Sequence, residues 1–156
     1  MRDAGTYDLD GLVNRAARSM ESVVLRFKKR CWAMQARPAD AAESARLAQM
    51  LKNRAKRARM SIRAYHGRVA HLVGIMQSHE VITRGEAQPV EERLTQLLAQ
   101  SLNRVEELLR RHERTMADRR AITSEKTSRN LLHGAKVGYR LIRRWGNNGR
   151  NGWDDI

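Results

Sequence analysis

The chain contains few of the residues that build disulfide-rich domains, β-sheets or thick hydrophobic cores. Among its 156 residues there are one cysteine and two prolines, and aromatic residues make up 4%. A single cysteine excludes a disulfide framework within the chain and favours a reducing compartment, so we expect a cytoplasmic protein. The shortage of aromatic and β-branched runs leaves little material for a sheet. Together these shortages predict long, thinly packed helices.

Two kinds of targeting or spanning segment are also missing. The first residues, MRDAGTYDLDG, are polar and acidic and do not resemble a secretory signal. No run approaches the roughly 18 consecutive apolar residues that a membrane-spanning helix needs. We therefore expect no membrane span.

Apolar residues recur at spacings of three and four through most of the chain, which is the period of an amphipathic helix. In the second predicted helix this spacing forms an a/d heptad seam, made of Ala48, Leu51, Ala55, Ala58, Ile62, Tyr65, Val69, Leu72 and Met76. The predicted fold is all-α, either an antiparallel hairpin of long helices or a three-to-four-helix bundle with coiled-coil-like packing. We expect one helical domain over residues 1–145, with helices at about 8–36, 40–82, 89–122 and 125–145.

Proline, glycine and capping residues mark the predicted helix ends. Pro38 disfavours helix in the residue before it and so ends the first helix. Asp40, with Glu43 three residues later, has the pattern of a capping box that begins the second helix. Gly85 is predicted to end that helix in a left-handed conformation, and Pro89 to begin the third. The pattern leaves open whether the third and fourth helices are continuous.

The charge is strongly positive and unevenly distributed. The formal net charge is +14, and residues 41–76 contain eight Lys or Arg but one acidic residue. The third predicted helix is nearly balanced, with seven Arg and six acidic residues over 89–123. An uncompensated basic patch is typical of proteins that bind a polyanion, although a solvated helix surface with no binding role gives the same composition. The candidate patch is Lys52, Arg54, Lys56, Arg57, Arg59 and Arg63.

Motifs that carry catalysis or metal binding are absent from the sequence. The five histidines form no H-E-x-x-H pattern, and one cysteine cannot make a zinc knuckle. Cys31 lies on the apolar stripe of the first helix and is predicted to act as a small hydrophobic residue. His112 lies on the apolar side of the third helix and is predicted to be a buried structural histidine. We expect no catalytic residue, no metal site and no cofactor, and hence a protein that is not an enzyme.

The stretch LLHGAKVGYRLIRRWGNNGRNGW, residues 131–153, has the composition of a docking helix followed by a flexible end. Its G-x-x-x-G spacing is typical of helix pairs in membranes, but Lys136 and Arg140 interrupt any apolar span. The pattern predicts an amphipathic helix with a glycine notch that lets a partner helix approach. The candidate docking residues are Leu131, Gly134, Ala135, Gly138, Leu141, Ile142 and Trp145, and residues 146–156 are predicted to be flexible.

Asn130 followed by Leu131 and Leu132, within TSRNLLHGAKVGYRLIRRWGNNG, resembles the end of flagellar and type III export chaperones of the hook–filament junction type. The resemblance implies a cytoplasmic, all-helical protein that holds a client with its C-terminal amphipathic helix. The charge departs from that family, whose members are usually less basic. The basic coiled-coil stalk proteins of the same export machines match the charge and the long helices, but share no motif with this chain.

Three functions are compatible with these patterns. The first is a non-enzymatic helical interaction protein, such as an export chaperone or stalk component, that binds a protein partner through its C-terminal amphipathic helix. The alternative is a helical nucleic-acid-binding protein that uses the Lys52–Arg63 patch and the Arg/Trp tail. The third is self-assembly, in which the heptad seam of the second helix pairs two copies of the chain as a homodimer.

Overall fold

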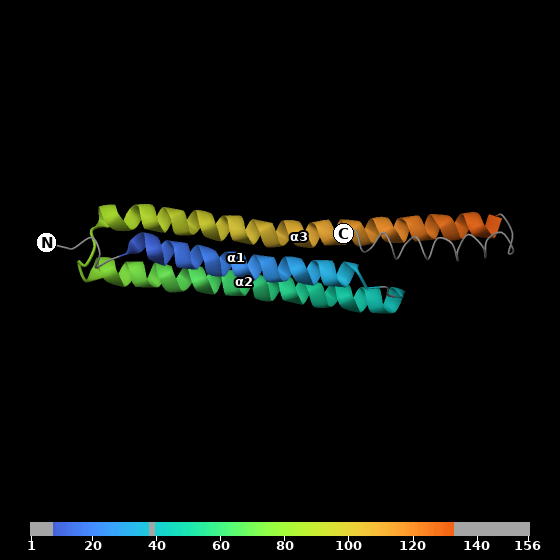
Figure 1. Ribbon diagram of the computed structural model, residues 1–156, viewed down its shortest axis with the longest axis horizontal. Helices are drawn as coiled ribbons and strands as arrows, with labels where there is room; N and C mark the ends of the chain where they lie inside the picture. Colours follow the sequence, from blue (N-terminus) through green and yellow to red (C-terminus); the bar gives the residue numbers. More distant parts are fainter. Residues whose placement is uncertain (1–7, 38–39, 133–156) are drawn as a thin grey trace. The chain divides into compact units, whose positions relative to one another are not determined.

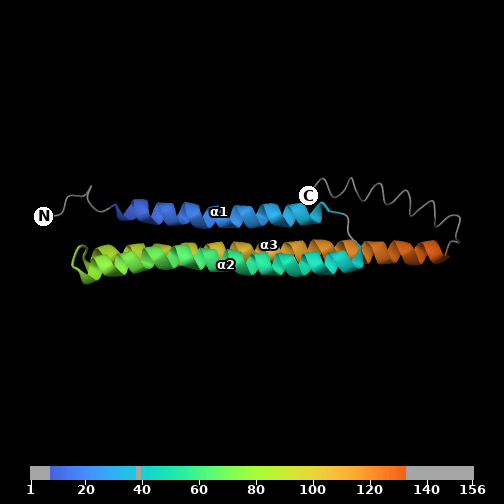
Figure 2. The ribbon, with the colours of Figure 1, turned by 90° about the horizontal axis from the view of Figure 1, so that it is seen from below.

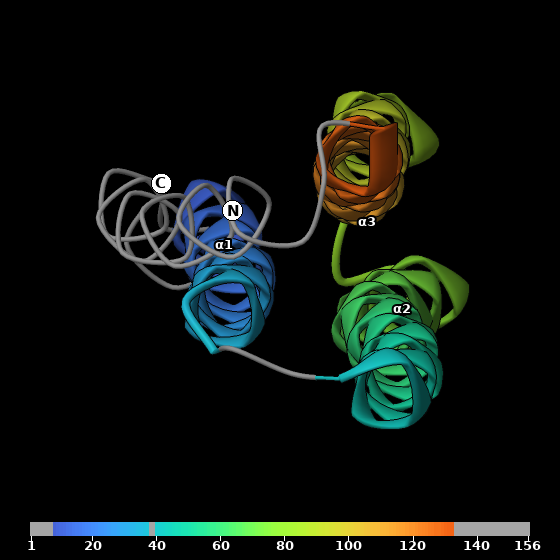
Figure 3. The same ribbon diagram turned by 90° about the vertical axis from the view of Figure 1, so that its right-hand side faces the viewer.

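The computed structural model describes residues 8–37 and 40–132, and over these ranges it is all-α, as predicted (Figure 1). Helix α1 spans Leu9–Gln35, α2 spans Ala41–Ser78 and α3 spans Arg84–Leu132. The described residues contain no strand, and the helices pack against one another. Figure 3, which looks nearly along the helices, shows each of them as a separate coil.

Each helix contributes to two compact units. The first unit comprises Met1–Lys28 and Asn53–Glu107, and the second comprises Lys29–Lys52 and Leu108–Ile156. The largest fully buried side chains of the first unit are aliphatic, and they come from all three helices: Val13, Met20, Val24, Ile62, Val73, Leu94 and Val105. The first unit therefore has its own hydrophobic core.

Polar contacts and a short connection show the relative directions of the three helices within the first unit. Asn14 and Glu21 of α1 contact Arg93 and Arg104 of α3, respectively, with a distance of 3.2 Å from the Arg93 guanidinium to the Asn14 side-chain oxygen. Because both sets of residue numbers increase together, α1 and α3 run parallel in this unit. The short connection over residues 79–83 makes α2 antiparallel to α3 (Figure 2). The predicted antiparallel hairpin is therefore α2 with α3, and α1 completes a three-helix arrangement.

Each helix begins with a side chain that caps its free backbone N–H groups. Asp8, Asp40 and Thr83 each accept a hydrogen bond from the backbone N–H three residues later, at 2.8, 2.8 and 3.1 Å. The predicted N-cap at Asp40 is therefore confirmed. Such caps satisfy donors that have no partner inside the helix, and each contributes on the order of 1 kcal/mol.

The junction between α2 and α3 differs from the prediction. Thr83 and Glu86 exchange backbone and side-chain hydrogen bonds of 3.1 and 3.0 Å, so a capping box starts α3 five residues before Pro89. Pro89 therefore lies inside the helix, where it lacks only the hydrogen bond to the carbonyl group of residue 85. Gly85, predicted to be left-handed, is helical; the left-handed residue is Glu80, with φ of 58°.

Glu80 ends α2 in a Schellman motif, whereas the sequence predicted a left-handed cap five residues later, at Gly85. The Val81 N–H donates to the Met76 carbonyl at 2.8 Å, and the Glu80 N–H donates to the Gln77 carbonyl at 3.0 Å. These bonds satisfy the last carbonyl groups of the helix without a glycine. Helix α2 consequently ends at Ser78 rather than near residue 82.

The predicted seam of α2 is correct up to Ile62 and wrong at Leu72. Leu51, Ala55, Ala58 and Ile62 are buried, but Leu72 is 40% exposed while the neighbouring Val73 is fully buried. Seven residues of a straight helix turn about 700°, which is about 20° short of the two full turns that a strict seven-residue repeat requires. Over several heptads this drift moves the buried position by one residue.

Two further predictions concern the apolar stripe of α1 and the length of the third helix. Val13, Ala16, Met20, Val23, Phe27 and Met34 are all buried, as their spacing predicts. Helix α3 continues through Thr123 and Ser124 to Leu132, so the third predicted helix and the start of the fourth form one helix. The Thr123 hydroxyl donates to the Arg119 carbonyl at 2.8 Å, which lets the threonine remain within the helix.

Candidate anionic-partner interface

The predicted basic patch lies on α2, and its side chains differ in exposure. Lys56, Arg57 and Arg63 are exposed, whereas Arg54 and Arg59 are half-buried. Lys52 is also exposed and belongs to the second unit. Three of the five patch residues in the first unit are therefore fully accessible to a partner.

Arg59 has an internal partner. Its guanidinium donates to the Glu106 carboxylate of α3 at 2.6 Å, and the two side chains are 25% and 42% exposed. A partly exposed ion pair of this kind contributes about 0.5 kcal/mol and fixes the two helices side by side. Arg59 is thus a structural residue of the α2–α3 pair.

Three exposed cations of the patch, Lys56, Arg57 and Arg63, have no ion-pair partner among the described residues. The segment of α2 from Asn53 to Ser78 contains six Lys or Arg and no Asp or Glu. Within the described part of the chain, no carboxylate oxygen lies within 4.0 Å of the charged group of Lys56, Arg57 or Arg63. Their charges therefore create a positive field directed toward solvent.

Two exposed apolar residues, which the sequence analysis did not single out, lie among these cations. Met60 is 59% exposed and Ile75 is 41% exposed, on the side of α2 opposite the buried Ile62. The sequence could have pointed to both, because each is an apolar residue that lies outside the heptad seam of a basic helix. We define the outer face of α2 as Lys56, Arg57, Met60, Arg63, Arg68 and Ile75, all of which are exposed.

The predicted docking residues of the C-terminal segment mostly lie outside the described residues. Leu131 belongs to the last turn of α3. The others, Gly134, Ala135, Gly138, Leu141, Ile142 and Trp145, and the predicted flexible tail at 146–156, fall beyond residue 132. Docking through this segment stays a prediction.

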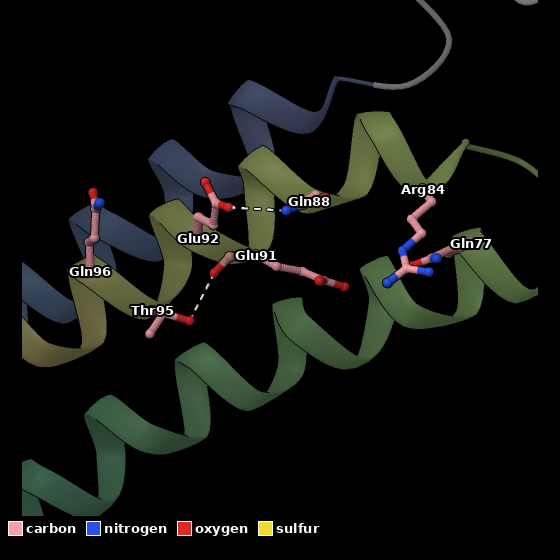
Figure 4. Close-up of a pocket in the computed structure, with 7 residues that line it drawn as sticks. All are labelled: Gln77, Arg84, Gln88, Glu91, Glu92, Thr95 and Gln96. Carbon is pink, nitrogen blue, oxygen red and sulfur yellow. Dashed lines mark hydrogen bonds between the residues drawn. The ribbon is translucent and has the colours of Figure 1, made fainter.

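An open polar hollow of about 640 Å³ lies where α2 ends and α3 begins (Figure 4). Its lining is Gln77, Arg84, Gln88, Glu91, Glu92, Thr95 and Gln96. Gln88 donates to the Glu92 carboxylate at 3.3 Å, and the Thr95 hydroxyl donates to the Glu91 carbonyl at 2.9 Å. These bonds connect residues of the same helix and do not converge on a common point. The hollow is therefore an open surface depression between α2 and α3.

The second unit buries a polar cluster around His112, as the sequence predicted for that histidine. The His112 ring nitrogen Nδ1 lies 3.1 Å from the side-chain amide nitrogen of Gln35, and both residues are buried. Burial is the largest effect and lowers the pKa of His112; Glu113 opposes it, Arg119 lowers the pKa further, and the Cys31 backbone opposes it least. The ring is therefore neutral at pH 7 and accepts the amide proton of Gln35.

Arg119 and Cys31 complete this cluster. The Arg119 guanidinium donates to the Gln35 backbone carbonyl at 2.8 Å and so places a cation at the C-terminus of α1. Burial raises the pKa of the Cys31 thiol to about 11, so the thiol stays protonated and unreactive. Cys31 thus has the predicted character of a small hydrophobic residue.

Within the described residues, no group of three or more His, Cys, Asp or Glu side chains is arranged to hold a metal ion. Over the same residues, none of the helices has a stretch of sufficient length and hydropathy to cross a lipid bilayer.

Comparisons with known proteins provide no relative for this chain. No protein-family model matches it, and neither a curated protein nor a solved structure was found to match it. Its own residues are therefore the basis for a functional proposal.

Proposed function

We propose that this chain is a non-enzymatic helical interaction protein that binds an anionic partner on the outer face of α2. The observation that carries the proposal is the absence of any acidic residue from Asn53 to Ser78, beside six Lys or Arg. We infer a cytoplasmic setting, which the single cysteine favours.

The contrast with α3 supports a binding role for these charges. The segment of α3 in the first unit, residues 84–107, carries three Arg and five Glu. Arg93 and Arg104 of that segment contact polar groups of α1, and Glu106 pairs with Arg59. Three of the eight charged residues in this segment thus connect α3 to its neighbouring helices. The charges of Lys56, Arg57 and Arg63 add mutual repulsion to the free protein, which an anionic partner would relieve.

A titration with two polyanions tests the proposal. Fluorescence anisotropy would follow binding of labelled poly-L-glutamate and of a labelled 30-nucleotide single-stranded DNA at about 50 mM salt. Replacing Lys56, Arg57 and Arg63 by Gln should weaken binding at least about tenfold, because three unpaired cations are removed. Binding should also fall steeply as salt is raised.

A matched variant controls for total charge. Replacing Arg110, Arg114 and Arg120 of α3, which are also exposed, removes three charges from another helix. We expect less than about a twofold change for this variant, since those charges lie outside the outer face. Equal losses for the two variants, or no binding of either probe by the parent protein, would contradict the proposal.

Exposed residues at the end of α3 support a second proposal, in which this end of the chain binds a protein partner. Residues 121–125 are all exposed, and Ile122 is 47% exposed although it is a large apolar residue. The sequence predicts that an amphipathic helix follows, and the finer proposal is that it captures a client, as in an export chaperone or stalk component. In the same titrations, a chain ending at Ser128 should keep its binding to both polyanions. A loss of that binding would show that residues 129–156, and not the outer face of α2, bind the polyanions.

A further inference from the structure

The outer face of α2 combines two apolar side chains with a set of cations. Met60 and Ile75 are 15 residues apart, which corresponds to about 22 Å along the helix and about 60° around it. They are 59% and 41% exposed. Single exposed apolar residues are common on protein surfaces, so their exposure alone identifies no site. Their surroundings are more informative.

Cations surround both apolar residues. Lys56 and Arg57 precede Met60 by one helical turn, and Arg63 follows it by almost one turn. Arg68 lies between Met60 and Ile75, with its guanidinium 5.4 Å from the centre of the Tyr65 ring. Arg68 is held over this ring and keeps its charge, because an aromatic face attracts a cation without neutralising it. The face thus presents two apolar contact points with positive charge around and between them.

We propose that the outer face of α2 docks an acidic amphipathic helix of a partner protein. Two apolar residues of that helix, about four turns apart, would cover Met60 and Ile75. Its flanking Asp and Glu side chains would pair with Arg57, Arg63 and Arg68. This inference rests on the proposed function and specifies the chemistry of the partner.

Charge argues against two occupants that the chain itself could supply: the same face of a second copy, and the segment after residue 132. In a symmetric dimer the same patch faces itself, so the cations of one copy would meet the cations of the other. The segment after residue 132 contains five Lys or Arg and two Asp, so it too is repelled by this face. An acidic partner outside the chain satisfies the charges of the face.

The apolar residues favour a protein over nucleic acid. A phosphate backbone interacts with Lys and Arg but gains little from covering Met60 or Ile75. An amphipathic helix gains from both, because burial of an apolar side chain strengthens binding and flanking charges orient the approach. A helix docked through apolar residues at helical spacing is a recurring mode of peptide recognition.

Two designed peptides serve as probes. The first is a labelled 22-residue helical peptide with two Leu residues, 15 positions apart on one face, flanked by six Glu residues. The second is the same peptide with both Leu residues replaced by Ser, so its charge is unchanged. A labelled 30-nucleotide single-stranded DNA and vesicles containing an anionic phospholipid provide probes without such apolar residues. Dissociation constants would be measured with the full chain by anisotropy, and vesicle binding by co-sedimentation.

Three protein variants separate the contributions. Met60→Ser with Ile75→Ser removes the apolar contacts and leaves every charge. Leu25→Ser is its control, because Leu25 is another exposed apolar residue, 42% exposed, on α1. Arg57→Gln with Arg63→Gln removes the charges and leaves the apolar contacts. Circular dichroism confirms that each variant keeps its helices.

The parent protein should bind the Leu peptide at least about tenfold more tightly than the Ser peptide. The Met60 and Ile75 variant should lose this preference without a change in DNA binding, and the Leu25 variant should retain it. The Arg57 and Arg63 variant should bind both peptides at least about fivefold more weakly.

Equal affinity for the two peptides would overturn the inference, as would unchanged Leu-peptide binding by the Met60 and Ile75 variant. In either case DNA or vesicle binding that still depends on Arg57 and Arg63 would leave the proposed function intact. If the charge variant keeps its affinity for every probe, both the inference and the proposed function are wrong.

Discussion

The two compact units bury different kinds of side chain. In the first unit the buried residues are aliphatic or aromatic, apart from the small polar residue Ser101. In the second unit Gln35 and His112 are buried together with Cys31, Met34, Leu47 and Leu51. The side-chain oxygen Oε1 of Gln35 is buried and has no hydrogen-bond partner among the described residues. Burying a polar atom without a partner costs about 1–3 kcal/mol, so the second unit contains an internal source of instability.

This difference separates two ways of holding helices together. An aliphatic core stabilises by removing apolar surface from water and is insensitive to pH. A core that contains histidine depends on keeping that ring neutral. The first unit, with the aliphatic core, also carries the uncompensated cations of α2. A pH-insensitive core suits a unit that must hold like charges close together.

The largest effect should come from the core of the first unit. Leu94 is fully buried, and Leu94→Ala should lower the free energy of unfolding by about 2–5 kcal/mol, because it removes buried apolar surface and leaves a cavity. Urea denaturation followed by circular dichroism would measure this loss, which should be similar at pH 8 and pH 5.5. Leu25→Ala, at a position that is 42% exposed, should cost less than about 1 kcal/mol. Equal costs at the two positions would refute the buried position of Leu94.

A smaller, pH-dependent effect should come from the second unit. Burial lowers the pKa of His112 in the folded chain, whereas the unfolded chain has the ordinary value of about 6.5. The unfolded state therefore binds the proton first as pH falls. The stability present above about pH 6.5 should decrease as pH falls toward the folded pKa. Thermal unfolding at pH 8 and pH 5.5 would measure the decrease.

Substituting His112 measures how much of this pH dependence of stability the histidine causes. His112→Leu should reduce this pH dependence and, at pH 8, cost about 1–3 kcal/mol because the Gln35 amide loses its partner. His71→Gln, at an exposed position of α2, should leave the pH dependence unchanged. If the His112 variant retains the full decrease between pH 8 and pH 5.5, another group causes it.

The smallest effects should come from replacing two glycines by alanine. One replacement should stabilise the chain and the other should destabilise it. A Cβ at Gly67 of α2 meets no atom within 4 Å, so Gly67→Ala should stabilise the chain by about 0.5–1 kcal/mol through its helix propensity. A Cβ at Gly11 would lie 2.1 Å from the Asp8 carboxylate that caps α1. Gly11→Ala should displace this cap and destabilise by up to about 1 kcal/mol. Unfolding midpoints that shift in the same direction would contradict this description of the two sites.

Local patterns in the sequence predicted a large part of this structure. The apolar stripe of α1 and the N-cap at Asp40 depend on residues within a few turns of one another, so spacing alone revealed them. The start of α3 was also encoded locally, in Thr83 and Glu86, but the prediction gave Pro89 more weight than this capping box. The candidate basic patch followed from composition, because an excess of Lys and Arg on one helix is visible without a fold.

The sequence by itself determined that the chain is helical, where most of the buried stripes lie and that α2 is basic. Tertiary structure decided that Val73 is buried while Leu72 is exposed, since drift of the helix changes which residue faces its neighbours. It also decided that Glu106 neutralises Arg59, while Lys56, Arg57 and Arg63 have no such partner within residues 8–37 and 40–132. It placed Arg119 at the end of α1 and Gln35 beside His112. These contacts join residues 47 to 84 positions apart, and local periodicity carries no information about which distant side chains meet.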